Sequence, residues 1–517
     1  MFQQQPNEPG DVSVGTPAPH RRVTLNVIAN TVSTALNAFC GFLILPFLIS
    51  QLGRDTYGFW VLIVATAGYF LVLDFGVSGA VGRLVAGHRS KDDIRSINVV
   101  VSTTAVLLLA LCCVVALLSY FLPIPFFALF EVPAAEQSDV ASALFIVGVT
   151  TALSFPGMIS YGFLWGYERF DVHNLVEIPV VLARTALTFI YIQSGSQLTE
   201  LALIVSGTSI AGYIIRTALC WWVEPRLSLR LHYFSLPVLK EMFVFGIWFG
   251  LLSLTRSLLP NVAPFVIGHS LGPGPVTTYT IPRLLIAYTN WMMVSATTAV
   301  APHAAVYHFT SESEKQQHLF LLGGRYTWAL SLFVLGGAVL FGFELLSLWQ
   351  GAPQPEEYRL LIILMGGEVI PLSQWITYSM IVSMGVHRRL AIFGVLEALT
   401  VLALSVLLVT VQGLEGVAIA VAAAGLLFRG ILQLCYGCGL VNISPWRYVQ
   451  SVFLPILLWS VPAFVVIALY RLCVTPDSWV LLAISAVLYT GVYGLSVFPA
   501  LTRTDPRSRS ETLPEQS

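Results

Sequence analysis

The sequence predicts an all-α protein that crosses a membrane about fourteen times, and three observations support this. Of the 517 residues, 56% are hydrophobic and only 10% are charged, whereas soluble domains carry about 25% charged residues. The apolar residues gather in fourteen long segments, and about 20 such residues span a bilayer as a helix. These segments lack the alternation of β-strands, and lipid admits only helices or closed barrels.

The fourteen segments follow one another with short connections. Their expected limits are 24–50, 58–86, 96–121, 139–165, 173–194, 198–222, 239–270, 276–302, 319–349, 359–386, 390–412, 416–440, 450–473 and 478–501. Residues 1–20 are polar and rich in Pro and Gln, so we expect a disordered cytoplasmic tail and no cleavable signal peptide. Residues 502–517 are expected to form a second cytoplasmic tail.

The distribution of Lys and Arg predicts the orientation in the membrane. With a cytoplasmic N-terminus, eighteen of the 26 basic residues fall in inner segments and five within helices. Only three, Arg54, Arg359 and Arg471, fall in outer segments. Because inner loops are enriched in Lys and Arg, we predict a multi-pass protein with both termini in the cytoplasm and an even number of spans.

A short internal repeat predicts two lobes. The first span ends with PFLISQLGRDTYG (residues 46–58), and the seventh ends with PFVIGHSLG (264–272) followed by Tyr279. Six spans separate the two motifs, so both helices run in the same direction, as in transporters built from parallel repeats. The prediction is a lobe of six spans at 21–222, a second lobe of six spans at 239–440, and an appended pair of spans at 441–501.

The segment between the predicted lobes, residues 223–238, is expected to lie on the cytoplasmic side. Its sequence RLSLRLHYFSLP (226–237) mixes Arg with Leu, Tyr and Phe. Such a mixture suits a segment that lies along the lipid headgroups. An ordinary polar loop is the alternative interpretation.

Four arginines lie deep inside predicted spans: Arg184, Arg256, Arg283 and Arg429. An arginine at the bilayer centre costs about 2.5–3.5 kcal/mol on insertion scales, so each must face water or a partner. We predict that they line a cationic, substrate-binding lumen between the lobes; structural bridges between helices are the alternative. Arg216 lies nearer the inner surface and is expected to snorkel.

Asparagines extend these polar faces. Asn290 lies seven residues after Arg283 and shares its helix face, and Asn30 and Asn37 lie on one face of the first span. All three are candidates for the lumen. For the face of the first span, polar contacts between helices are an equally good interpretation.

Acidic residues form the second buried set: Asp74, Glu177, Glu368 and Glu397. They can balance the arginine charges, or they can bind a coupling H⁺ or Na⁺. Charge balance is the preferred interpretation, because the numbers of buried acids and arginines nearly match.

The sequence offers no catalytic or metal site. Cys435 and Cys438 form a C-x-x-C, but no histidine or second pair stands nearby to complete a zinc site. The longest outer loop, 122–138, leaves little room for a catalytic domain. A net charge of −1 gives no footprint for nucleic acid. We therefore expect no enzyme, no cofactor and no nucleic-acid partner.

Three segments carry a family resemblance: PFLISQLGRDTYGFW (46–60), LDFGVSGAVGRLVA (73–86) and FPGMISYGFLWGYERFDVHN (155–174). They resemble the bacterial polysaccharide-transport flippases, which include the O-antigen and exopolysaccharide repeat-unit flippases. That superfamily also contains lipid II flippases and multidrug and toxin extruders. The resemblance is strongest over about residues 20–220 and continues as topology beyond them. It implies a MATE-like fold, with two six-helix lobes around a central lumen.

The resemblance also implies a function in the bacterial inner membrane. The expected activity is alternating-access transfer of an undecaprenyl-pyrophosphate-linked oligosaccharide to the outer leaflet. The expected partners are this lipid-linked substrate, membrane lipids, a glycan polymerase and a chain-length regulator. One alternative is a multidrug or other small-molecule exporter, and another is a membrane glycosyltransferase or glycan polymerase. The loop after the second span, GHRSKDDIRS (87–96), lacks the basic motif usual in major-facilitator exporters.

Overall fold

The computed structural model describes residues 20–298 except Phe75, residues 312–502, and four single positions between these ranges. Within its helices, some side chains lie outside this description: those of 20–28, 244–249, 252–254, 256–258, Ser78, Ala296 and Thr298. The predicted tails, 1–20 and 502–517, fall almost wholly outside the described residues. Across the described ranges every regular element is a helix, which confirms the predicted fold class.

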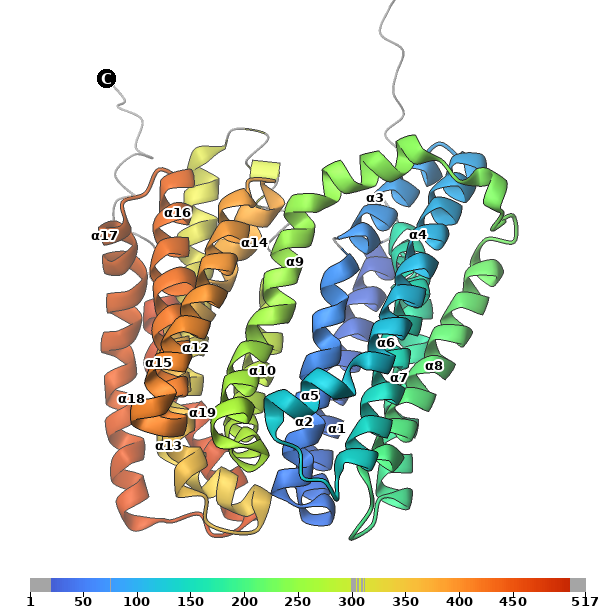
Figure 1. Ribbon diagram of the computed structural model, residues 1–517. Coiled ribbons are helices and arrows are strands. Elements are labelled where there is room, and N and C mark those ends of the chain that lie inside the picture. The colour runs from blue at the N-terminus through green and yellow to red at the C-terminus, as the bar shows by residue number, and fades with distance from the viewer. Residues whose placement is uncertain are drawn as a thin grey trace, which may run out of the picture.

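The first half of the chain, which we call the N-half, contains helices α1 to α8 (Figure 1). Their bounds are α1 His20–Leu52, α2 Arg54–Phe70, η1 Leu71–Asp74, α3 Val77–Arg89, α4 Ile94–Phe121, α5 Pro123–Phe130, α6 Gln137–Gly166, α7 Phe170–Tyr191 and α8 Leu198–Val223.

The remainder, which we call the C-half, contains α9 to α19 and three short helical turns. The bounds are η2 Leu231–Tyr233, α9 Leu236–Leu271, α10 Pro273–Thr298, α12 Ser313–Gln350, α13 Pro355–Ser373, α14 Trp375–Ser383, α15 Arg388–Gly425, η3 Leu426–Leu432, α16 Gln433–Leu440, α17 Pro445–Tyr448, η4 Val449–Phe453, α18 Leu454–Cys473 and α19 Trp479–Thr502. Both η3 and η4 are π-helical.

Eleven helical stretches of the described residues are long and apolar enough to cross a membrane. Helices α9 and α10, of 36 and 26 residues, are of comparable length but fall outside that count. One of the eleven, Arg388–Leu440, is 53 residues long. The protein is therefore a multi-pass membrane protein, and the predicted number of fourteen spans is approximate.

The 53-residue stretch contains a chain reversal. Gly413 has a φ of 57° inside α15, a conformation that glycine adopts without steric cost. The carbonyl oxygen of Leu408 lies so close to Gly416 that a Cβ there would overlap it. In a straight helix, residues eight positions apart are separated by about 12 Å. The chain therefore turns back at Gly413 and crosses twice, as the separate predicted spans 390–412 and 416–440 require.

The two ends of the helix bundle differ in charge. The end at the top of Figure 1 carries the connections after α3, α8, α14 and α16. We call it the Arg-rich end, because the basic residues of these connections and their flanking turns include Arg89, Arg95, Arg226, Arg230, Arg388, Arg389 and Arg447. The end with the connections after α1, α9, α12 and α18 is called the opposite end. The sequence predicts that the Arg-rich end is cytoplasmic.

At the opposite end, the apolar core of the described residues is continuous across both halves. One cluster there joins Leu48 and Phe59 of the N-half to Val266, Trp349 and Leu360 of the C-half. Towards the Arg-rich end, the described residues form separate clusters. One contains α3, α4, the end of α8 and Met242 near the start of α9, and others contain α14, α15 and α16, or α12, α18 and α19. Apart from the first turns of α9, which pack on the N-half, the described residues of the two halves therefore belong to separate clusters at the Arg-rich end.

The first half of α1 shows the same asymmetry. Asn30, Thr31, Val32 and Ala35 are exposed, although they lie in a membrane-spanning helix. In its second half, the ring of Phe42 stacks on Trp349 of α12 with ring centroids 4.5 Å apart. The indole of Trp349 also donates a hydrogen bond to the carbonyl oxygen of Phe42 at 2.7 Å.

The connection between α8 and α9 is fixed to the side of α4. The Asn98 side chain donates to the carbonyl oxygen of Arg226 at 3.3 Å and accepts from the amide of Ser228 at 2.9 Å. The hydroxyl of Ser102 accepts from the amide of Arg230 at 3.2 Å. Polar side chains of α4 thus satisfy the backbone of an extended segment, as buried backbone groups require.

Helices α18 and α19 pack on α12. The hydroxyl of Tyr489 donates to the carbonyl oxygen of Phe333, and that of Tyr493 to the carbonyl oxygen of Ala329, both at 2.7 Å. Gly336 lies under Phe464 and Tyr489, where a side chain would collide with both rings. The pair is therefore attached to the outside of the C-half, at the place in the sequence where an appended pair is expected. The predicted lobe boundaries themselves stay a prediction.

Candidate functional site

Three of the predicted charged residues meet inside the C-half. Arg429 donates from its two terminal nitrogens to Glu368, at 2.8 and 2.7 Å, and from Nε to Glu397 at 2.8 Å. Both glutamates are 2% exposed. They come from α13 and α15, while Arg429 lies in η3, so the cluster joins three helical segments. We call Arg429, Glu368 and Glu397 the C-half triad.

The local backbone of η3 makes room for this arginine. Arg429 lies inside the π-helical turn Leu426–Leu432, and such turns are frequent at functional sites. One turn earlier, Gly425 leaves the space that the guanidinium occupies, since a Cβ there would lie 2.6 Å from Nη2. The sequence Gly425–Gly430 therefore combines a small residue and a widened turn to aim Arg429 at two acids.

Arg283 lies close to the triad but is not bonded into it. Its charge acts on both Glu368 and Glu397 from α10. It makes no hydrogen bond to the part of the chain that the structure describes, and its side chain is half-buried. With both glutamates ionised, the triad carries one net negative charge, which Arg283 offsets. Of the three predicted arginines whose side chains are described, Arg283 makes no hydrogen bond to the described residues, whereas Arg184 and Arg429 each make at least two.

Polar groups on α10 and its neighbours extend the site towards α1. The amide of Asn290 accepts a hydrogen bond from the indole of Trp375 at 3.0 Å and donates to the carbonyl oxygen of Ile286 at 3.1 Å. The hydroxyl of Tyr288 is buried and without a partner among the described residues. A Cβ on Gly41 of α1 would lie 2.7 Å from that hydroxyl. Helix α10 therefore approaches α1 at Gly41, four residues after Asn37.

The N-half holds the other predicted arginine whose side chain is described. Arg184 donates to the hydroxyls of Thr208 and Ser209 on α8, at 3.2 and 2.9 Å. Glu177 pairs with Arg216 at 2.8 Å. Arg216 is 7% exposed, so the expectation that it snorkels to the surface is wrong. Glu177 on α7 provides the negative charge that water or lipid headgroups would provide for an arginine at the surface.

The remaining predicted residues do not join either cluster. Asn30 is exposed on α1, and Asn37 donates to the carbonyl oxygen of Ser33 at 3.0 Å. Asp74 ends η1 and is half-buried, with interactions of its own. The side chain of Arg256 lies outside the described residues. The structure thus brings together Arg283, Glu368, Glu397 and Arg429, and keeps Arg184 and Glu177 apart from them.

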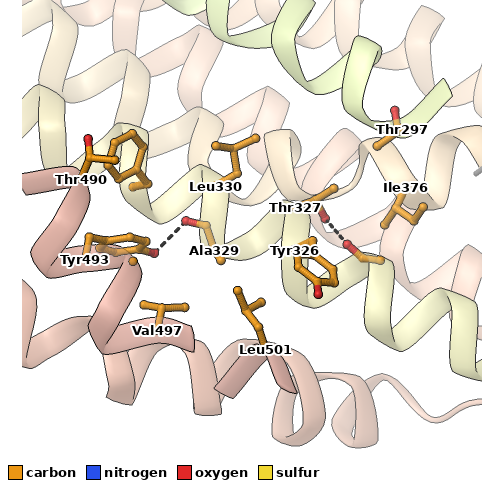
Figure 2. Close-up of a pocket in the computed structure, with 13 residues that line it drawn as sticks. Thr297, Tyr326, Thr327, Ala329, Leu330, Ile376, Thr490, Tyr493, Val497 and Leu501 are labelled. Carbon is orange, nitrogen blue, oxygen red and sulfur yellow. Dashed lines mark hydrogen bonds between the residues drawn. The ribbon is translucent and has the colours of Figure 1, made fainter. Parts of the chain in front are cut away.

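One cavity of about 560 Å³ lies in the half of the helix bundle nearer the Arg-rich end. Figure 2 shows it between α12 and α19, with Thr297 of α10 and Ile376 of α14 at one side. Its lining is mostly apolar and includes Leu330, Phe333 and Val497. We call it the α12–α19 groove. No pattern in the sequence predicts this groove, although glycines recur in both spans and two of them, Gly323 and Gly494, line it.

The described residues contain no group of three His, Cys, Asp or Glu side chains that could hold a metal ion. The seven cysteines are all free. The acids of the C-half triad are held in ion pairs with Arg429. A guanidinium without such a partner suits an anion, and a carboxylate is the type of group that takes up a proton or a cation, so both uses stay predictions for this site.

Comparisons with known proteins agree with this fold. Residues 23–308 match the family described as polysaccharide biosynthesis proteins. A provisionally named O-antigen transporter of Shigella flexneri is 22% identical over 412 residues, which cover 80% of this chain and 97% of the relative.

Solved structures are similar over most of the chain. A lipid II flippase, MurJ, in an inward closed conformation gives a TM-score of 0.68 at 15% identity, covering 92% of this chain and 98% of that one. An inward-facing multidrug resistance transporter of the MATE family gives 0.65 at 15% identity, covering 81% and 98%. At these identities the likeness shows the fold, which is the MATE-like fold that the sequence predicts.

Proposed function

The chain belongs to the family of polysaccharide biosynthesis proteins, and from this premise we propose that it is a flippase for a lipid-linked oligosaccharide. The substrate class is an undecaprenyl-pyrophosphate-linked repeat unit of O-antigen or exopolysaccharide. The protein moves it from the cytoplasmic to the outer leaflet of the inner membrane. The transporter names of its relatives support this assignment and give no support to an enzyme.

The observation that carries the proposal is the asymmetric packing of the two halves. Among the described residues, the halves share one apolar core at the opposite end, whereas at the Arg-rich end only the first turns of α9 join a cluster of the N-half. A transporter that works by alternating access needs two such arrangements, each open at one end. With the Arg-rich end in the cytoplasm, this structure is the state that receives substrate from the inside.

The pyrophosphate is proposed to bind near Arg283. A guanidinium offers planar, charge-assisted donors that match phosphate oxygens. Arg283 keeps its donors free of the described residues, while Arg429 uses its donors on Glu368 and Glu397. Asn30 and Asn37 on the exposed first half of α1 and Asn290 on α10 provide polar groups for the sugars. Arg184 and Arg256 remain candidates from the sequence.

The α12–α19 groove is proposed to hold part of the lipid chain. Its mostly apolar lining suits an isoprenoid, and its volume lies within the range of small-molecule sites, about 300–1,000 Å³. Thr297 places one side of it on the same helix as Arg283 and Asn290. The lipid then stays at the membrane side of α10 while the headgroup lies between the halves.

The energy for transfer is proposed to come from the membrane potential and an ion. Outward movement of an anionic headgroup gains about 2.3 kcal/mol per charge per 100 mV. Glu368 or Asp74 can return the protein to its starting state with a bound H⁺ or Na⁺. A glycan polymerase and a chain-length regulator are the proposed partners that use the transferred repeat unit.

The fold match to a MATE transporter favours one second candidate, a drug exporter. In that case, cells that lack this protein would retain a cationic drug at a higher level, and expression of the chain would lower it. The arginines of the proposed binding region disfavour cationic drugs, because like charges repel.

The test of the flippase function measures the leaflet in which the lipid-linked repeat unit resides. Spheroplasts of a deletion strain are treated with a membrane-impermeant glycosidase or lectin. We expect the labelled fraction to fall to background and to return when the full chain is expressed. Normal outer-leaflet labelling in the deletion strain would exclude the proposed function. A drug accumulation assay in the same strains measures the second candidate.

A further inference from the structure

Arg54 spans the two halves at the opposite end of the bundle. It is the first residue of α2, in the N-half, and follows the single linking residue Gly53. From Nη1 it donates to the carboxylate of Glu357 at 2.7 Å and to the hydroxyl of Thr278 at 3.2 Å. From Nη2 it donates to the side-chain oxygens of Gln350 and Gln354, both at 3.0 Å. Every one of these acceptors belongs to the C-half.

The acceptors come from three parts of the C-half. Thr278 lies in the first turns of α10, Gln350 ends α12, and Glu357 lies in the first turn of α13. Glu357 is 1% exposed, while the side chain of Arg54 is 36% exposed. The carboxylate is therefore buried, and its charge partner reaches it from the other half. A buried charge needs such a partner.

The backbone around Arg54 is packed as closely as its side chain. The hydroxyl of Thr277 donates to the carbonyl oxygen of Arg54 at 2.6 Å. One turn further along α2, a Cβ on Gly58 would overlap the carbonyl oxygen of Pro273. Closure of this end therefore depends on a charged contact and on a close approach that only glycine allows.

We propose that Arg54, Thr278, Gln350, Gln354 and Glu357 form a latch that holds the opposite end closed. When the halves separate there, Arg54 leaves all four acceptors at once, and Glu357 becomes hydrated. The latch thus favours the state open at the Arg-rich end, and its release accompanies opening at the other end. It goes beyond the proposed function, because it sets the balance between two conformations whatever the substrate is.

The test uses the full chain in lipid nanodiscs, where both faces are accessible and no substrate is needed. Val276, two residues before Thr278 in α10, is completely buried. A Val276→Cys variant reports opening through its rate of reaction with a bulky, charged maleimide. The chain without this substitution gives the background from the seven native cysteines. Added to Val276→Cys, Arg54→Ala and Glu357→Gln are each expected to raise the rate about tenfold, which corresponds to about 1.4 kcal/mol.

Arg359 provides a matched control. It pairs with Glu415 at 3.0 Å at the same end, but both residues belong to the C-half. Arg359→Ala is therefore expected to leave the labelling rate unchanged. Gly58→Ala, which wedges α2 from α10 without altering charge, is expected to raise the rate.

Equal labelling rates in the Arg54→Ala, Glu357→Gln and unsubstituted chains would overturn the latch. If Arg54→Ala fails to accumulate in the membrane, Arg54→Lys and Glu357→Gln carry the test, because both keep hydrogen-bonding side chains of similar size. Since labelling needs no glycan, a failure here would leave the flippase function standing. A failure of glycan transfer would likewise leave the latch standing.

Discussion

Arg429 and Glu368 form a two-pronged ion pair inside the C-half, with both terminal nitrogens of the arginine directed at the two carboxylate oxygens. Glu397 accepts the third donor, Nε, at 2.8 Å. Three charges from three helical segments are therefore fixed to one another, and both carboxylates are buried. The arrangement supports the interpretation in which buried acids balance buried arginines.

The first prediction concerns the stability of this triad. Arg429→Met leaves two carboxylates, each 2% exposed, without their partner. Breaking a buried pair from one side typically costs about 3–5 kcal/mol. We expect a clear drop in the midpoint of thermal unfolding, measured by size-exclusion chromatography of the heated, detergent-solubilised protein.

The triple variant Arg429→Met, Glu368→Gln and Glu397→Gln provides the control. It removes all three charges together, and replacing a whole buried network is often neutral for stability. We expect most of the lost thermal stability to return. If this neutral variant also transfers glycan normally, the triad is structural and does not bind the coupling ion.

The second prediction concerns Arg283. Its guanidinium makes no hydrogen bond to the described residues, so its removal should cost little packing. Arg283→Ala is expected to abolish glycan export while membrane abundance stays normal, because the pyrophosphate loses a charge-assisted donor. Arg283→Lys keeps the charge without the planar fork and should retain partial export. The readouts are surface glycan and immunoblotting of membranes.

Normal export in Arg283→Ala would remove this residue from the proposed headgroup site. The sequence makes the same prediction for Arg256→Ala. Normal export in both variants would contradict the cationic lumen as a whole.

The burial of Glu368 and Glu397 agrees with the sequence, but the sequence could not predict that both meet Arg429, and it gave no sign that Glu357 is buried. Arg429, Glu368 and Glu397 were identifiable one by one from their depth in apolar segments. Their meeting depends on the π-helical turn in η3, because one extra residue in a turn rotates the following side chains by about 100°. No pattern in the sequence around Arg429 marks such a turn.

Pairing across helices also explains why the prediction that Arg216 snorkels to the surface is wrong. Depth alone suggested a side chain that reaches the surface, but Glu177 stands opposite it on α7. Likewise, the sequence shows Arg54 only as one of three basic residues in the predicted outer segments, and nothing in it indicates a partner. Its acceptors lie 224 to 303 positions further along the chain, and only the packing of the two halves brings them within reach.

The third prediction concerns the connection at the Arg-rich end, just outside the spans. Glu224 accepts from Arg226 at 2.8 and 3.0 Å. These hydrogen bonds hold the pKa of Glu224 below its ordinary value. A lowered pKa in the folded state means that this stabilisation is complete above the ordinary pKa and is lost as the pH falls through the folded value.

We therefore expect amide hydrogen exchange at Ser228 and Arg230, corrected for its intrinsic pH dependence, to be slow at neutral pH. It should accelerate only below about pH 4.5, the ordinary pKa of the group. Glu224→Gln should produce part of this acceleration at neutral pH. Asn98→Ala removes both hydrogen bonds of that side chain to the connection. It should therefore accelerate exchange more than Glu224→Gln does. Unchanged exchange in Asn98→Ala would contradict the anchoring.

The last prediction tests the α12–α19 groove with two glycines of α19. Gly494 lines the groove and Gly491 does not, while both are exposed and have open space where a Cβ would lie. Gly494→Phe is therefore expected to fill the groove without disturbing helix packing, and Gly491→Phe is expected to place the same ring against lipid.

If the groove holds the lipid chain, Gly494→Phe lowers the amount of repeat unit in the outer leaflet several-fold, whereas Gly491→Phe leaves it near the level of the unsubstituted chain. Equal transfer by the two variants, at equal membrane abundance, would mean that the lipid passes elsewhere. Because both substitutions add the same apolar side chain to the same helix, a difference between them cannot come from hydrophobicity or helix propensity, and it isolates the groove as the cause.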